Sequence, residues 1–156
     1  MQIALYMAVM GAGFGIGTGF LVNFCTQHFS LKNNFIAGAL IAALASLVTV
    51  VFLHPEFSWI TIAPLGAAIA VAYSAILTMF SNQVDADSQG WVMGITGAIM
   101  AFAFGMNSVL IGMLADLSPR VPLFLATGCL IISAVIMHFF QGIKEEPEKK
   151  VLMENK

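Results

Sequence analysis

The stretch QGWVMGITGAIMAFAFGMNSVLIGMLAD, residues 89–116, decides the fold class of this chain. It contains no Asp, Glu, Lys or Arg before Asp116 at its end. A helix rises about 1.5 Å per residue, so a helix over this stretch can cross the hydrocarbon core of a bilayer, which is about 30 Å thick. The stretch therefore predicts a transmembrane helix over residues 90–115.

Small residues recur along this stretch at steps of three and four. They are Gly90, Gly94, Ala98, Ala101, Gly105, Ser108 and Gly112. This spacing places them on one side of a helix, where the lack of side-chain bulk lets a second helix backbone come close. The pattern predicts a helix–helix interface. We expect the four glycines of this stripe to be packing positions.

The rest of the chain has a similar composition. Of the 156 residues of the whole chain, 60% are hydrophobic and only 9% are charged, whereas soluble domains average roughly 25% charged residues. Such a chain has too little polar surface to cover a globule in water, which favours an all-α integral membrane protein. The net charge of −2 is small and says little about partners, and no basic patch indicates a nucleic-acid partner.

Hydrophobic segments joined by short polar connections divide the chain into five predicted spans. They are about residues 2–24, 35–53, 59–80, 90–115 and 121–143. Together they form a transmembrane helical domain over residues 1–143. The remaining residues, 144–156, are charged and have little to bury, so we expect a disordered tail.

The first span is rich in glycine. Gly11, Gly15 and Gly19 repeat the G-x-x-x-G spacing, and so do Gly13 and Gly17. This pattern is typical of a close helix–helix contact. The alternative is a flexible or broken helix beside a transport pathway. The chain also begins almost inside this apolar segment, which favours a fragment of a longer protein.

The positions of the basic residues predict the orientation in the membrane. Five spans place the tail on the same side as the connections at residues 26–34 and 81–89. That side holds Lys32, Lys144, Lys149, Lys150 and Lys156. The other side holds Arg120 alone. Because basic residues concentrate in the cytoplasm, we expect a cytoplasmic C-terminus and an external N-terminus.

Motifs for catalysis are absent from the sequence, which predicts neither an enzyme nor a cofactor. Asp85 and Asp87 alternate in a polar loop, which favours solvated acids over a metal or catalytic site. Cys25 and Cys129 are far apart and favour buried apolar thiols over a disulfide or metal site. His138, near the end of the last span, favours an interfacial histidine over a proton relay.

The polar residues inside the spans include Tyr73, Ser74 and Asn107. The amide of Asn107 needs a partner within the membrane. A neighbouring helix, a water-filled cavity or a substrate could each supply that partner.

Several strings resemble the major facilitator superfamily, especially its drug:proton antiporter branch. They are Ser81-Asn82-Gln83-Val84, Gln89-Gly90-Trp91-Val92-Met93-Gly94-Ile95 and Gly112-Met113-Leu114-Ala115-Asp116. In that family a "QG" pair opens the eleventh helix and a "GxLxD"-like end closes it. The five hydrophobic blocks fit helices eight to twelve. Residues 29–32 (FSLK) take the place of the family's basic cytoplasmic loop motif, but residues 27–28 (QH) replace its expected Asp-Arg.

The resemblance implies the C-terminal part of a secondary active transporter that moves a small solute or drug by alternating access. The fold would be a partial C-terminal half in a bacterial-type inner (plasma) membrane. Tyr73 and its neighbours, on the cavity-lining tenth helix, would belong to the substrate pathway, and the glycine stripe of the eleventh helix would pack on the N-terminal half. Its partners would be the lipid bilayer, a small-molecule substrate, and that missing half or another copy of the chain.

Two alternatives to this function stay open. The chain could be a small, non-transporting membrane protein that oligomerises through its glycine-rich helix faces. It could also be a transporter fragment without a function of its own.

Overall fold

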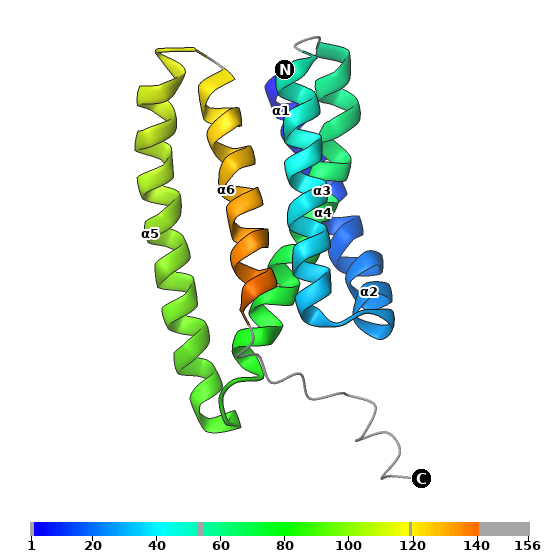
Figure 1. Cartoon of the computed structure of the whole chain (residues 1–156), viewed down its shortest axis with the longest axis vertical. Helices are drawn as coiled ribbons and strands as arrows, with labels where there is room; N and C mark the ends of the chain where they lie inside the picture. Colours follow the sequence, from blue (N-terminus) through cyan, green and yellow to red (C-terminus); the bar gives the residue numbers. More distant parts are fainter. Residues whose placement is uncertain (1, 53–54, 119, 141–156) are drawn as a thin grey trace.

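The computed structural model describes residues 2–52, 55–118 and 120–140, and this part of the chain is all α-helical, as expected (Figure 1). Its elements are α1 (Gln2–Ile16), η1 (Gly17–Leu21), α2 (Val22–His28), α3 (Leu31–Val51), α4 (Pro55–Ser81), η2 (Ala86–Ser88), α5 (Gln89–Ala115) and α6 (Arg120–Phe139). Here η1 is a turn of π-helix and η2 a turn of 3-10 helix. The expected tail at 144–156 and the end of the last expected span lie outside the described residues.

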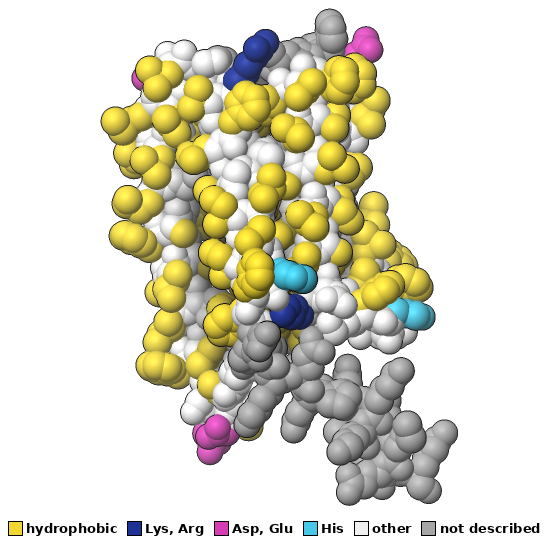
Figure 2. Space-filling view, in the orientation of Figure 1, with side chains coloured by type: hydrophobic (Ala, Val, Ile, Leu, Met, Phe, Trp, Pro, Cys, Tyr) yellow, Lys and Arg dark blue, Asp and Glu magenta, His cyan; other side chains and the backbone are white. Residues whose placement is uncertain are grey.

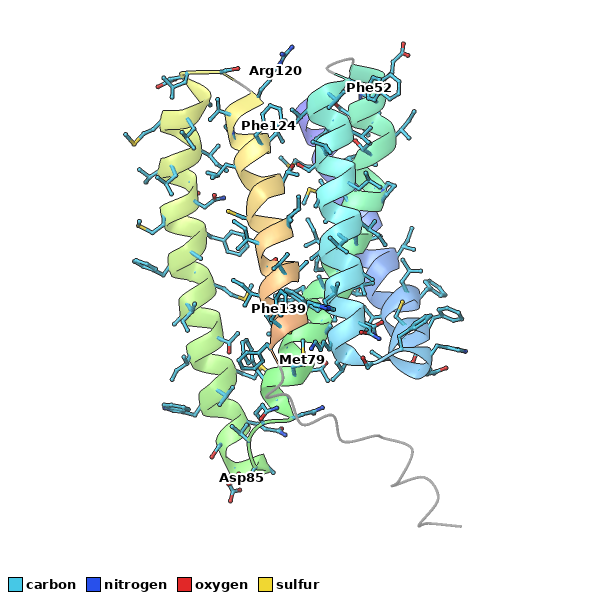
Figure 3. All side chains as sticks on the ribbon, in the orientation of Figure 1. Phe52, Met79, Asp85, Arg120, Phe124 and Phe139 are labelled. Carbon is cyan, nitrogen blue, oxygen red and sulfur yellow. The ribbon has the colours of Figure 1, made fainter. Side chains whose placement is uncertain are left out.

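These elements make five helices that are long and apolar enough to cross a membrane. The first consists of α1, η1 and α2 in one continuous run, and the others are α3, α4, α5 and α6. Successive helices run in opposite directions, so Phe52 and Arg120 lie at one end of the molecule and Asp85 and Phe139 at the other (Figure 3). The chain therefore has the build of a membrane protein.

Hydrophobic side chains cover the face between these two ends, and charged side chains lie near the ends (Figure 2). In water so much exposed apolar surface would drive association. In a bilayer the same surface contacts lipid. The distribution of side chains thus agrees with the length and composition of the helices.

The connection between the first two spans is shorter than the expected polar turn at 26–34. Helix α2 continues to His28 and α3 begins at Leu31. The reason is an N-cap, because the Oγ of Ser30 accepts a hydrogen bond of 3.3 Å from the N–H of Asn33. A serine in this position satisfies one of the free N–H groups at the start of a helix.

Small residues let α4 pack closely against α1 and α3. A methyl group added at Gly17 would lie 2.9 Å from the Cα of Ala67 in α4. One added at Gly38 of α3 would lie 2.7 Å from the carbonyl oxygen of Ala68. Glycine is needed at both positions because the neighbouring helix leaves no room for a side chain.

Hydroxyl groups add polar contacts between the packed helices. The Oγ1 of Thr127 in α6 donates to the Oγ of Ser46 in α3 over 3.0 Å, and both residues are 5% exposed. Thr49 of α3 and Thr61 of α4 share a hydrogen bond of 2.7 Å between their hydroxyls. Helix α3 is therefore joined to both neighbours by buried or half-buried hydrogen bonds.

A lysine joins the start of α3 to the end of α6. The Nζ of Lys32 donates to the carbonyl oxygens of His138 and Phe140, each over 2.9 Å. The last carbonyls of a helix have no partner inside the helix and carry partial negative charge. The ammonium group of Lys32 therefore caps the C-terminal end of α6.

Helix α5 stands apart from this packed group. It forms the outer edge of the molecule (Figure 1) and has no buried residue. Within the described residues it contacts only α4, α6 and η2, its neighbours along the chain. The packed group thus consists of α1, α3, α4 and α6, with α5 beside it.

Candidate functional site

Two of the expected pathway residues, Tyr73 and Ser74, lie on α4 inside the packed group. Both are half-buried. The ring of Tyr73 faces Phe14 of α1, with the ring centroids 6.3 Å apart and the planes tilted by 50°. Neither hydroxyl forms a hydrogen bond with another described residue. Each could therefore bond to a group that is not part of the described chain.

The third expected pathway residue, Asn107, lies on α5 and is exposed. Its side chain forms no hydrogen bond with a described residue, so none of the α-helices described here supplies the expected partner for its amide. No contact given by the structure joins Asn107 to Tyr73 or Ser74. That these three residues line one substrate pathway therefore stays a prediction.

The glycines expected to pack face open space among the described residues. They are Gly11, Gly15 and Gly19 of the first span and Gly90, Gly94, Gly105 and Gly112 of α5. A methyl group added at any of them would meet nothing within 4 Å. Packing of these glycines against a helix from another half or another copy stays a prediction.

Other glycines make the close contacts inside the chain. Gly13 and Gly17 lie on the face of the first span that meets α4, and Gly66 of α4 meets the backbone of α1 at Met10 and Phe14. Sequence reasoning noted the spacing of Gly13 and Gly17 but did not select them. The signal that could have found them is the row of small residues that they meet on α4, Ala63, Ala67 and Ala70.

No three or more described His, Cys, Asp or Glu residues lie close enough together to hold a metal ion. Asp85 and Asp87 are exposed beside the turn before α5. Cys25 is half-buried and Cys129 is exposed, and both thiols are free. The expectation that both thiols are buried is thus wrong for Cys129 within this chain, because α6 packs on α3 with its other side.

Two histidines, His28 and His138, lie in the last turns of α2 and α6. The ring of His28 stacks on Phe24 with centroids 4.5 Å apart, and its Nδ1 lies 2.9 Å from the carbonyl oxygen of Phe24. The backbone of His138 accepts from Lys32. The ring of His28 therefore contacts Phe24, whereas the contact of His138 with Lys32 involves its backbone alone.

Comparison with known proteins gives no further identification, because no family model, no curated protein sequence and no solved structure matches this chain. What the structure offers is a packed group of helices with polar side chains on α4, next to a helix whose small-residue stripe is uncovered. Such a surface suits the close approach of another transmembrane helix.

Proposed function

We propose that this chain is the C-terminal portion of a secondary active transporter that moves a small solute or drug across a membrane by alternating access. Two features support the proposal. Five apolar helices, each long enough to cross a membrane, run in alternating directions. In addition, the strings around residues 81–95 and 112–116 resemble the major facilitator superfamily. In this proposal the chain acts together with helices of an N-terminal half.

The uncovered stripe of α5 is the observation that carries the proposal. A methyl group added at Gly13, Gly17, Gly38 or Gly66 would lie closer than van der Waals distance to a neighbouring helix, whereas one added at a glycine of α5 would meet no described atom within 4 Å. Small residues on a membrane helix allow the backbone of another helix to come close, and the close van der Waals packing stabilises the association of the two helices. The stripe therefore suits a helix of the N-terminal half.

The polar groups of α4 and α5 suit a pathway between the two halves. Tyr73, Ser74 and Asn107 have side chains without a hydrogen-bond partner among the described residues. Burial of a polar group in hydrocarbon without a hydrogen-bond partner costs roughly several kcal/mol of free energy. Water or substrate between the halves would supply the partners, which is the role we propose for these three residues.

We further infer a plasma-membrane protein with a cytoplasmic C-terminus. Lys32 donates to the last carbonyls of α6 and Arg120 begins that helix, so these two described cations lie at opposite ends of α6. Orientation therefore rests on the lysines of residues 144–156. Reporter fusions at Asn155 and within residues 85–87 should signal the cytoplasm. A fusion at Leu117 should signal the other side, and a cytoplasmic signal there would overturn this orientation.

A small membrane protein that oligomerises through its glycine faces is the second candidate function. The same uncovered stripe of α5 favours it, because a second copy could cover that stripe as well as an N-terminal half could. In this candidate the chain needs no solute and no other polypeptide.

A transport assay combined with cross-linking separates the two candidates. Cells that express the complete genomic region around this chain should expel fluorescent dyes, and the isolated 156-residue chain in liposomes should not. The variant Gly97→Cys, combined with Cys25→Ser and Cys129→Ser, places a single thiol on α5 between the stripe residues Gly94 and Ala101. Cross-links formed by this thiol identify the helix that lies next to α5. Cross-linked homodimers in cells that express the complete region, without expulsion of dye, would contradict the transporter and support the oligomer. Dye transport by the isolated chain would contradict the need for another half.

A further inference from the structure

The first span changes helix type near its middle. In η1 the N–H of Val22 donates to the carbonyl oxygen of Gly17, five residues back, instead of four as in an α-helix. The hydroxyl of Thr18 lies 3.2 Å and 3.0 Å from the carbonyl oxygens of Phe14 and Gly15 and provides them with an additional donor. Single π turns inside α-helices are rare and occur frequently at functional sites.

The two halves of this span are held differently. Before the π turn, α1 lies against the backbone of α4 through Gly13, and Gly17 at the start of the turn contacts Ala67 and Ala70. After the turn, α2 has no buried residue. The π turn therefore separates α1, whose backbone lies against α4, from α2, which contacts α4 and α3 without a buried residue.

We propose that η1 is a hinge about which α2 rotates while α1 stays fixed on α4. A π turn contains one residue more than an α turn. If it relaxes to α-helix, each residue of α2 moves to the angular place now held by the next residue, which is a rotation of about 100° and a shift of about 1.5 Å. The exposed ring of Phe24 would then take the half-buried place of Cys25, and Thr26 would turn outward to the place of Gln27.

A buried amide in α3 can be satisfied by the second orientation of α2. Asn34 of α3 is only 3% exposed, and its Nδ2 has no hydrogen-bond partner among the described residues. It lies one helical turn after Ser30, which ends the connection from α2. A buried N–H without a partner is unfavourable, so an orientation of α2 that offers an acceptor to this amide gains a hydrogen bond. This inference does not require the chain to transport a solute.

The two native cysteines allow a direct test, because Cys25 lies in α2 and Cys129 in α6. Spin labels on both report the distance between these helices in the full chain, reconstituted in liposomes and diluted with unlabelled protein. We expect two distance populations. Deletion of Gly19 removes the extra residue of the π turn and keeps the present orientation of α2, so it should leave one population.

Two further variants make the test decisive. A label on α1, in Leu5→Cys combined with Cys25→Ser, should show one population with Cys129, because α1 is anchored. Gly19→Ala adds a methyl group that meets no described atom within 4 Å and retains the extra residue of the π turn, so two populations should remain in this control. The hinge is overturned if the unaltered chain shows a single narrow Cys25–Cys129 distance. It is also overturned if two populations persist unchanged after the deletion.

Discussion

Helices α4 and α5 are both 27-residue apolar helices with small residues along one side, yet their surroundings differ completely. Ala70 of α4 is fully buried, and Gly66 and Ala68 meet neighbouring backbones. On α5 a methyl group added at any of the glycines would meet no described atom within 4 Å. A small-residue stripe therefore marks a surface able to receive a helix, but only the neighbouring helices decide whether it is occupied.

The largest expected effect comes from adding bulk to an occupied contact. In Gly38→Leu the new side chain begins 2.7 Å from the carbonyl oxygen of Ala68 and 3.0 Å from Ala72. Neither backbone can give way without moving α4, so the cost should be at or above the upper end of the 1–3 kcal/mol that is typical of overpacking. Unfolding of the chain in bicelles by a denaturing detergent measures this loss.

The matched change on α5 is Gly94→Leu in the same isolated chain. Its side chain enters open space, and leucine favours helix over glycine by roughly 1 kcal/mol. The variant should therefore unfold no more easily than the unaltered chain. If Gly38→Leu and Gly94→Leu destabilised the chain equally, the conclusion that the stripe of α5 is unoccupied in this chain would be wrong.

The next prediction concerns Gly94→Leu in the complete transporter. If a helix of the N-terminal half covers the stripe there, the same substitution that is harmless in the isolated chain should lower dye transport or folded yield sharply. Met100→Leu, off the stripe and nearly equal in volume, should stay near wild type, since such swaps usually cost less than about 1.5 kcal/mol. Equal tolerance of both substitutions would show that the stripe faces lipid.

The number and order of the spans could be predicted from the sequence, because long apolar runs separated by short polar connections leave few other possibilities. Helix α5 spans Gln89–Ala115, against the expected residues 90–115. The choice between the two glycine sets of the first span could not be predicted. Both sets have the same spacing, and only the small residues of α4 decide that Gly13 and Gly17 face inward.

Features that depend on a few hydrogen bonds were also beyond reach. The π turn at Gly17–Leu21 lies in a glycine-rich run whose composition allows several helix types. The contact of Lys32 with the end of α6 joins residues 106 positions apart, which no local pattern records. For the candidate site, residue types suggested Tyr73 and Asn107, but their separation onto a packed and an unpacked helix depends on tertiary structure.

A moderate effect is expected from the hydrogen bond that joins α3 to α6. In Thr127→Val the methyl that replaces the hydroxyl preserves the shape of the buried side chain but leaves Ser46 Oγ without its donor. Hydrogen bonds between membrane helices average about 0.6 kcal/mol and reach about 1.7 kcal/mol. Unfolding of Thr127→Val, Ser46→Ala and the double variant measures the coupling between the two residues. Additive losses would show that the two hydroxyls do not stabilise this interface.

The smallest predicted effect sharpens the comparison at the helix ends. Lys32 caps the last carbonyls of α6, whereas α5 is followed by an acid, Asp116, which cannot donate to carbonyls when ionised. Lys32→Met keeps most of the side-chain length and removes the charge, so it should lose about 0.3–1 kcal/mol of stability, the usual contribution of a cation at a helix C-terminus.

The loss should also be local. A spin label at Phe139, at the end of α6, should become more mobile in Lys32→Met, while a label at Met113, at the end of α5, should not change. Lys32→Arg retains the cation and should restore most of the immobility at Phe139. The cap acts on α6 alone, so equal changes at both labels would mean that Lys32 stabilises the whole bundle. The difference between α6, which packs on α3, and α5, which stands apart, would then have to be explained by side-chain packing.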